Sequence, residues 1–201
     1  MNATQDLGAR INDTALDQLF REARSFSKWQ DKPIAPSLVE ELYDLLKFGP
    51  TSANTSPARF VFLTTPEAKA RLVPLLPEMN QEKARTAPVV AIVAYDLEFY
   101  HKLDKLMPFR DIKGWFSGDP VQAKTTAVQS GTLQGAYLIM AARALGLDTG
   151  PMLGDLGKID QEFFAGTTLH SNFICALGYG DKTQLHPRLP RLDFAEAAQT
   201  L

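Results

Sequence analysis

The chain has 201 residues, 45% of them hydrophobic, and carries 21 Lys and Arg against 23 Asp and Glu, for a net charge of −2. This length is typical of one domain and allows a buried core without a disulfide or a structural metal. The nearly balanced charge argues against nucleic-acid binding. The longest apolar stretch, Pro88 to Tyr95, is too short to cross a membrane.

The N-terminal sequence and the scarce cysteines indicate a cytoplasmic protein. Asp6 lies where a signal peptide would carry apolar residues. Cys175 is the only cysteine, and His101, His170 and His186 match no metal-ligand spacing. We therefore expect no metal site, and any redox chemistry requires a bound organic cofactor.

Hydrophobic periodicity and helix caps predict a helix-rich chain with few strands. In chain order, the predicted elements are a helix at 14–24, a helix at 37–48, a strand at 59–64, a helix from 66, a strand at 89–95, a helix at 97–106, a long helix at 120–145, a short helix ending near 164 and a strand at 172–179. Ser37 and Glu40 form a capping-box pattern at the second helix, and Asp193 with Glu196 predicts a capped turn in the tail. The long helix is apolar nearly all round, so we expect it to be the spine of the core or of a subunit interface.

This order of elements predicts an α+β fold in one domain, residues 1–201. Strands and helices do not alternate regularly, so we expect helices on both faces of a small sheet, a three-layer α/β/α sandwich. No G-x-G-x-x-G follows a predicted strand, which disfavours a nicotinamide-binding Rossmann domain.

Three segments carry candidate chemistry, and each has a simpler interpretation. Residues 24–27 (RSFS) could hold a phosphate, or could be a solvated helix end. Residues 49–57 (GPTSANTSP) could contact the edge of a planar polar ring, or could be a connector that satisfies its own backbone. Residues 149–154 (TGPMLG), with Arg188 and Arg191, could approach an anion or a ring closely, or could be a helix end and a basic tail.

Taken together and in this order, the segments resemble the FMN-dependent nitroreductase family. The residues that carry the resemblance are Arg24 to Ser27, Pro50 to Ala58, Leu145 to Met152, Leu177 to Gly180, and Pro190 to Leu192. The resemblance covers nearly the whole chain. It implies an obligate homodimer with a small mixed sheet, FMN sites at the interface and NADH or NADPH as reductant. It also implies that the C-terminal segment, about 183–201, packs on the partner subunit.

The resemblance also implies the residues of the cofactor site. The implied FMN contacts are Arg24, Ser25, Ser27, Pro50, Thr51, Ser52, Asn54, Gly150, Pro151, Met152, Arg188 and Arg191. Of these, Arg24 and Arg191 would hold the phosphate with Arg188 as a helper, and Gly150 would allow close approach of the backbone to the ring.

The chain departs from the family pattern at three positions. Ser27 replaces a second arginine, and the candidates to compensate for the missing phosphate charge are Lys28 and Arg188. Ser56 and Ala58 replace the usual glutamine and tryptophan, which reshapes the pocket and affects its substrate range.

Within the family, four strings resemble the malonic semialdehyde reductases of pyrimidine degradation. These strings are Phe48 to Arg59, Glu98 to Tyr100, Arg143 to Met152, and Arg188 to Leu192. The implied reaction reduces malonic semialdehyde, a small electrophile, to 3-hydroxypropionate.

A carboxylated substrate needs a cation opposite the flavin, and the candidates are Arg59, Arg110 and Lys113. Trp115 and Phe116 are candidates for a lid over the ring, and no side chain is assigned as a catalytic acid or base.

Three alternatives remain open at the level of sequence. The first is a broad-specificity NAD(P)H nitroreductase or quinone reductase. The second is a non-catalytic flavin-binding protein, and the third is a flavin-free helical partner protein.

Overall fold

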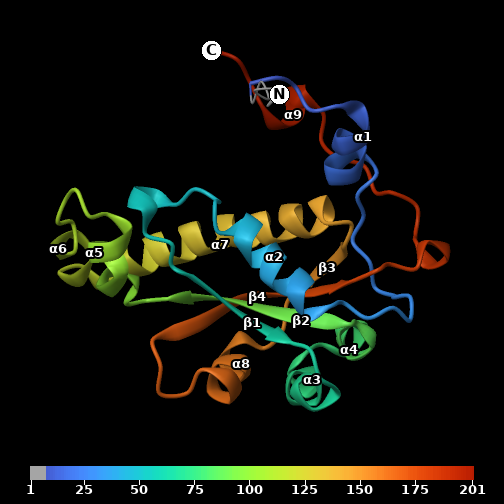
Figure 1. Ribbon diagram of the computed structural model, residues 1–201, viewed down its shortest axis with the longest axis horizontal. Helices are drawn as coiled ribbons and strands as arrows, with labels where there is room; N and C mark the ends of the chain where they lie inside the picture. The colour runs from blue at the N-terminus through green and yellow to red at the C-terminus, as the bar shows by residue number, and fades with distance from the viewer. Residues whose placement is uncertain (1–7) are drawn as a thin grey trace, which may run out of the picture.

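A four-stranded sheet lies between two layers of helices in the computed structural model, which describes residues 8–201 (Figure 1). The strands are β1 (Ala58–Leu63), β2 (Val89–Asp96), β3 (Asp148–Met152) and β4 (Leu169–Gly178), in the spatial order β1-β2-β4-β3. All neighbouring strands pair antiparallel, whereas a mixed sheet was expected. Among the described residues, the one parallel pairing is an isolated bridge between Ser25 and Thr149.

The helices of the described residues are α1 (Asp13–Leu16), α2 (Pro36–Leu46), α3 (Pro66–Leu72), α4 (Glu78–Thr86), α5 (Leu103–Leu106), α6 (Gly114–Ser117), α7 (Pro120–Ala144), α8 (Leu156–Phe163) and α9 (Phe194–Ala197). Helices α2 and α7 cover one face of the sheet, and α3, α4 and α8 cover the other (Figure 1). This confirms the predicted arrangement of helices on both faces. Asp6 lies outside the described residues.

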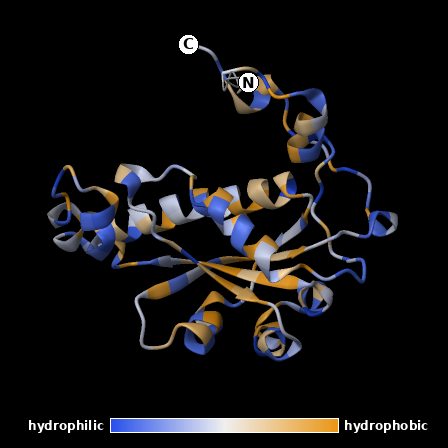
Figure 2. Ribbon diagram, in the orientation of Figure 1, coloured by the Kyte–Doolittle hydropathy of each residue, from blue (hydrophilic) through white to orange (hydrophobic). Residues whose placement is uncertain are grey.

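Strand β2 shows why the sheet is the middle layer. Its apolar residues alternate between the two faces, as the pleat requires. Val89, Ala91 and Val93 belong to the core beneath α2 and α7, and Val90 and Ile92 belong to the core on the opposite face. The strands are accordingly the most continuously hydrophobic part of the ribbon in Figure 2.

The helix starts were predicted with mixed success. Asp119 caps α7 by accepting hydrogen bonds from the backbone of the first turn, and Asp193 forms the predicted capping box of α9. The capping box at Ser37 is wrong, because α2 starts at Pro36, with Ala35 at the N-cap position. Proline has a backbone angle that suits the first helical position, so the helix starts before Ser37. The predicted helix at 14–24 is α1 followed by a π-helical turn, Asp17–Arg21.

Strand β3 is not among the predicted strands. Its residues are Asp-Thr-Gly-Pro-Met, and both Gly and Pro are typical of turns. Pro151 is tolerated because β3 lies at the edge of the sheet, where a missing backbone N–H leaves fewer ladder bonds unmade.

A third apolar cluster closes the end of the sheet near α5 and α6 (Figure 1). Phe116 belongs to it and is only 3% exposed, with its ring edge-on to Phe99 at 5.0 Å between centroids. Phe116, named above as a candidate for the lid, is therefore a core residue in this structure. Trp115, the adjacent residue, remains 48% exposed.

Cys175 is fully buried in β4, where removal from water raises the pKa of its thiol to about 12. Among the described residues, no helix is both long and apolar enough to cross a membrane, and this includes α7.

Helix α7 approaches the sheet closely because it has glycine at position 135. A β-carbon added at Gly135 would lie 2.5 Å from Phe173 Cε1 and 3.2 Å from Val93 Cγ1. These contacts are shorter than packed atoms tolerate.

Replacing Gly135 with alanine should therefore destabilise the fold. We expect Gly135→Ala to lower the free energy of unfolding by about 1–3 kcal/mol, although alanine favours helix by about 1 kcal/mol. Urea unfolding measures the loss. The control is Gly157→Ala in α8, where the nearest atom to an added β-carbon is at 3.6 Å and stability should not fall. Equal stability of both variants would contradict the close packing of α7.

Candidate functional site

The segment from Arg24 to Trp29 crosses the ends of β3 and β4 and carries the first candidate residues. Phe26 N donates to Thr149 O at 2.9 Å, and Trp29 Nε1 donates to Lys83 O at 3.0 Å. The Phe26 side chain is buried, so the segment is anchored while Ser25 and Ser27 on either side remain exposed.

Beside this segment lies a hollow of about 470 Å³, which we call the cationic hollow. Its lining residues are Ala23, Arg24, Ser25, Phe26, Ser27, Lys28, Arg143, Asp181, Gln184, Leu185, His186, Pro187, Arg188, Leu189 and Arg191. The structure thus brings Arg24, Arg188 and Arg191 together although more than 160 residues separate the first from the others. Five lining side chains are Arg or Lys, whereas Asp181 is the only carboxylate in the lining.

The arginines of the cationic hollow contact carbonyl oxygens instead of carboxylates. Arg24 Nη2 donates to His186 O, and Arg188 Nη2 donates to Ala23 O at 3.0 Å. Arg191 Nη1 donates to the carbonyl oxygens of its own segment, at Leu189 and Pro190. These bonds orient the guanidinium groups but leave their charge uncompensated. Such a cluster attracts a polyanion, and serine hydroxyls at its rim suit phosphate oxygens.

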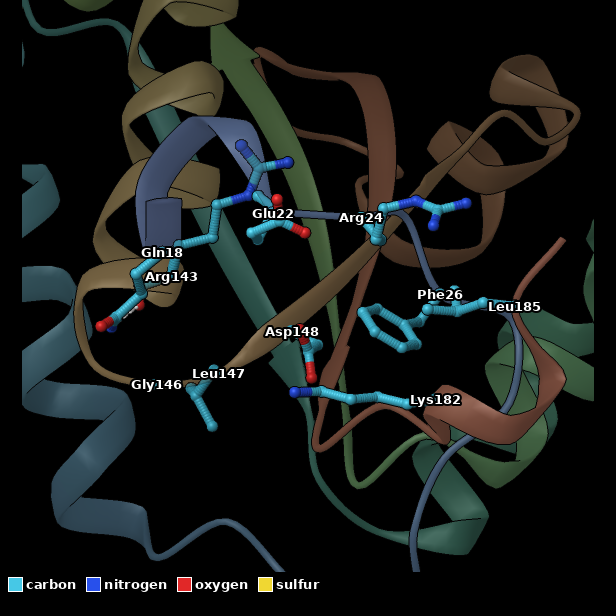
Figure 3. A pocket seen from close by; sticks show the side chains of 11 residues that line it. Gln18, Glu22, Arg24, Phe26, Arg143, Gly146, Leu147, Asp148, Lys182 and Leu185 are labelled. Atoms are coloured by element: carbon cyan, nitrogen blue, oxygen red, sulfur yellow. Dashed lines mark hydrogen bonds between the residues drawn. The ribbon is translucent and has the colours of Figure 1, made fainter. Parts of the chain in front are cut away.

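A second hollow, of about 600 Å³, lies behind the same segment (Figure 3). Arg143, from the last turn of α7, lines both hollows, and its Nη1 donates to Leu19 O at 2.9 Å. Burial lowers the pKa of Arg143. Figure 3 shows Glu22, Asp148 and Lys182 around the second hollow, so its charges are mixed, unlike those of the cationic hollow.

Strand β3 provides an apolar surface next to the cationic hollow. Pro151 and Met152 line a hollow of about 430 Å³ between β3 and α7, together with Phe173. Met152 is mostly a core residue, at 7% exposure. At Gly150, the close approach is to this chain itself, because an added β-carbon would lie 2.4 Å from Phe26 O. Gly150 thus leaves room for the Arg24–Trp29 segment, and close approach of its backbone to the ring stays a prediction.

Lys83 lies behind β3 and was not a candidate. This lysine of α4 is 8% exposed, its Nζ lies 3.4 Å from Pro151 O, and it forms no ion pair with any described residue. Burial lowers the pKa of Lys83. A buried ammonium group without a carboxylate costs stability, and such groups cluster at functional sites.

The loop at 51–56 has an unusual backbone. Ala53, Asn54 and Ser56 have φ angles of 47°, 52° and 41°, a region that costs energy for residues with a β-carbon. Thr51 Oγ1 accepts from Ser56 N at 3.1 Å, and Asn54 Nδ2 donates to Leu106 O at 2.7 Å. The loop is therefore held in a strained shape by its own side chains, which is the simpler interpretation, while strain of this kind is also typical of binding loops.

This loop does not meet the cationic hollow within one chain. Ser52 N donates to Ser130 Oγ in the middle of α7, whereas the cationic hollow lies at Arg143 near its end. The 13 residues between these positions correspond to about 20 Å along the helix. Pro50, Thr51, Ser52 and Asn54 therefore form a second cluster, separate from that of Arg24.

The three cationic side chains proposed to contact a substrate carboxylate differ in their contacts within the protein. Arg59 pairs with Asp96 at 2.8 Å and also donates to the carbonyls of Ser56 and Ala58. Arg110 lies over the ring of Trp115, 4.8 Å from its centroid. Lys113 immediately precedes α6 and is half-buried.

Two site residues, Arg143 and Lys83, escaped the sequence analysis for the same reason. Arg143 has the position of a cation that interacts with a helix C-terminus, and Lys83 occurs in a polar helix. The local sequence around Arg143 or Lys83 does not indicate burial, because each side chain is buried by segments that are remote in sequence.

Comparison with known proteins matches the chain to one family and to relatives that share one name. The Nitroreductase family profile matches residues 20–179. A relative from Stenotrophomonas maltophilia (strain K279a) is 57% identical over 190 residues, 94% of this chain and 97% of its own. A relative from Caulobacter sp. (strain K31) is 54% identical over 195 residues, 96% of this chain and 100% of its own. Both are named "Putative NADH dehydrogenase/NAD(P)H nitroreductase".

Solved structures share the fold at lower identity. A "putative nitroreductase" of Bacillus subtilis superposes with a TM-score of 0.83 at 18% identity, over 94% of this chain and 100% of that chain. A "putative nitroreductase" of Exiguobacterium sibiricum in complex with FMN superposes with a TM-score of 0.82 at 22% identity, over 96% and 99% of the two chains. With four-fifths of its length matched by the family profile, the chain belongs to the Nitroreductase family.

Proposed function

We propose that the protein is an FMN-dependent oxidoreductase that uses NADH or NADPH. The observation that carries this proposal is that the cationic hollow lies beside β3, the edge strand whose Pro151 and Met152 line the apolar hollow. Ser25 is bridged to Thr149, and Pro151 follows two residues later, about 7 Å along the strand. FMN combines a phosphate dianion with a flat aromatic ring, so its two ends match these two surfaces.

The chain offers a specific residue set for each part of FMN. Arg24, Arg188, Arg191 and Lys28 would hold the phosphate, with hydroxyls from Ser25 and Ser27. Lys28 and Arg188 supply the charge that Ser27 lacks. Bound FMN would supply hydride transfer between the nicotinamide and the substrate. Lys83 places an unpaired positive charge behind β3, which favours negative charge on a group bound in front of it.

We propose that two copies of the chain complete each site. The loop with Thr51, Ser52 and Asn54 lies about 20 Å along α7 from the cationic hollow, too far to complete a site there within one chain. A second copy docked on the helical face would bring its loop to the hollow. Large apolar side chains on that face are exposed, including Phe48 at 76% and Leu133 at 50%.

The terminal segments support the same arrangement. The C-terminal segment with α9 projects beyond the layered body (Figure 1). Leu189, Leu192 and Phe194 are each at least 68% exposed there. We propose that the segment from about 183 to 201 packs on the partner subunit, where these side chains leave water.

For the substrate, we propose malonic semialdehyde, reduced to 3-hydroxypropionate in pyrimidine degradation. The support is the resemblance of Phe48 to Arg59, Glu98 to Tyr100, Arg143 to Met152 and Arg188 to Leu192 to reductases of that aldehyde. The second candidate is a broad-specificity nitroreductase or quinone reductase, which the names of the relatives favour.

One experiment separates these candidates. We expect the purified protein to be yellow, and NAD(P)H to bleach its flavin absorbance without oxygen. Turnover of malonic semialdehyde, measured as NAD(P)H oxidation, should exceed that of a nitroaromatic compound at equal concentration. Faster turnover of the nitroaromatic compound would favour the broad-specificity enzyme. Bound flavin without NAD(P)H oxidation would indicate a non-catalytic flavin-binding protein, and a colourless protein that does not take up FMN would contradict the proposal.

The phosphate assignment is tested by arginine variants. We expect Arg24→Ala, Arg188→Ala and Arg191→Ala each to raise the dissociation constant of FMN about 10-fold or more, because a hydrogen bond to a charged group contributes about 1.5–3 kcal/mol. Fluorescence titration of the flavin-free protein measures this constant. Arg71→Ala is the matched control, because Arg71 pairs with Glu162 in α8 on the opposite face of the sheet. Unchanged affinity in all three variants would contradict the assignment.

We expect Lys83 to lower the stability of the flavin-free protein and to strengthen FMN binding. Burial lowers the pKa of Lys83 in the folded protein. At pH values between this lowered pKa and the pKa of Lys83 in the unfolded chain, the unfolded chain binds more protons than the folded protein, so stability rises with pH there. The charge therefore costs stability at pH 7, and this cost disappears as pH rises toward the ordinary value of about 10.4. We expect Lys83→Met to stabilise the flavin-free protein at pH 7, with a difference that shrinks by pH 10, and to weaken FMN binding. Thermal unfolding at both pH values measures the first effect, with Lys158→Met as an exposed control. Lower stability of Lys83→Met at pH 7 would contradict this account.

A further inference from the structure

We propose that Lys102 and Lys105 bind the carboxylate of the substrate, so that they set a preference for organic anions. This inference rests on the proposed function, because it assigns these lysines to the reducing site of the dimer. Both residues line a hollow of about 660 Å³ beside the 51–56 loop, which we call the β1 hollow.

The β1 hollow has an apolar side and a cationic side. Its lining residues are Tyr43, Lys47, Phe48, Asn54, Ser56, Ala58, Arg59, Phe60, Phe62, Lys102, Lys105, Leu106 and Gln134. Four of these side chains are aromatic and four are cations, and none is a carboxylate. The lining therefore suits a molecule with a hydrophobic or uncharged body and one negative end.

Two of the four cations are already neutralised. Lys47 pairs with Asp44, and Arg59 pairs with Asp96 at 2.8 Å. Lys102 and Lys105 form no ion pair or side-chain hydrogen bond that the described part of the chain supplies, so their charge is available. They are three residues apart at the junction with α5, a spacing that places helical side chains on one face. An anion between them can contact both ammonium groups.

The lysines are fixed relative to the strained loop. Asn54 Nδ2 donates to Leu106 O at 2.7 Å, so the loop is bonded to the residue that follows Lys105. Gln134 Oε1 accepts from Ala58 N at 2.9 Å and ties the start of β1, two residues after the loop, to α7. In the proposed dimer, this loop contacts the flavin of the partner copy. The lysines would then lie at the rim of that site, and the small side chains of Ser56 and Ala58 leave room beside it.

A different occupant of the β1 hollow is the C-terminal segment of a second copy. That segment carries Asp193, Glu196 and exposed apolar residues, which also complement cations and aromatic rings. We favour the substrate because Lys102 and Lys105 lie at the loop assigned to the cofactor. The experiment below separates the two occupants.

The test compares two acceptors of similar size and shape, one of them charged and one neutral. 4-Nitrobenzoate and 4-nitrobenzamide carry the same reducible nitro group, and the first is an anion at pH 7. In the FMN-loaded protein, we expect Lys102→Gln and Lys105→Gln each to raise the KM for 4-nitrobenzoate about threefold, and the double variant about tenfold. The KM for 4-nitrobenzamide and both kcat values should stay within twofold. Lys158→Gln, on the opposite face, is the matched control and should change neither KM.

Salt and direct binding give readouts that do not depend on turnover. Raising the ionic strength should raise the KM for 4-nitrobenzoate in the parent and much less in the double variant. Calorimetric titration with benzoate should show about tenfold weaker binding to the double variant, whereas benzamide binding should not change. The titration decides the role of the lysines even if the protein reduces neither acceptor, a result that would count against the proposed function alone.

Two outcomes would overturn the inference. Equal effects on benzoate and benzamide, or none on either, would show that the lysines do not recognise a carboxylate. A weaker dimer in sedimentation, with benzoate affinity unchanged, would assign the β1 hollow to the C-terminal segment of the second copy.

Discussion

Three glycines, one within β3, one at the end of β4 and one just after it, leave the space in which the Arg24–Trp29 segment lies against the sheet. An added β-carbon would come within 2.4 Å of Phe26 O at Gly150, within 2.7 Å of Trp29 Cε3 at Gly178, and within 2.1 Å of Phe26 Cδ1 at Gly180. No rearrangement of a flexible side chain relieves the first of these contacts, because the opposing atom belongs to the backbone. The Arg24–Trp29 segment can therefore lie in this position only because these three glycines have no β-carbon.

With the Arg24–Trp29 segment in this position, the charges of the cationic hollow and the path of the chain determine which residues lie together. Arg188 bonds to the carbonyl of Ala23, so the C-terminal segment is joined to the N-terminal one directly at the cationic hollow. Five cationic side chains line that hollow against a single carboxylate, Asp181, which itself accepts from Thr183, so the excess of positive charge remains. The 51–56 loop, by contrast, is bonded to the middle of α7 and to Leu106. A single chain therefore carries two candidate clusters of different chemistry, one cationic and one polar and strained, at separate positions along one helix.

Local physics predicted the layered fold better than it predicted the site. The central strand and α7 were recognised because an apolar run and an N-cap aspartate are local signals. Strand β3 was missed because Gly150 and Pro151 are typical of turns, and only their position at a sheet edge explains them. The capping-box pattern at Ser37 gave the wrong helix start, because α2 already begins at Pro36.

For the site, the local interpretation of each segment favoured a simple connector or helix end. Arg24 and Arg188 could be joined only through the family resemblance, because their proximity arises from packing across most of the chain. Lys83 shows the limit most clearly. Its neighbours in sequence are polar, and its burial results from Trp29 and β3, which no local pattern reports.

The buried thiol of Cys175 has a consequence for a protein that handles electrons. Peroxide and electrophilic quinones attack the thiolate form of cysteine, and oxidation follows access to that form. With a pKa of about 12 and no contact with solvent, Cys175 stays protonated across the physiological range. The chain has no other cysteine, so it offers no exposed thiol to such oxidants.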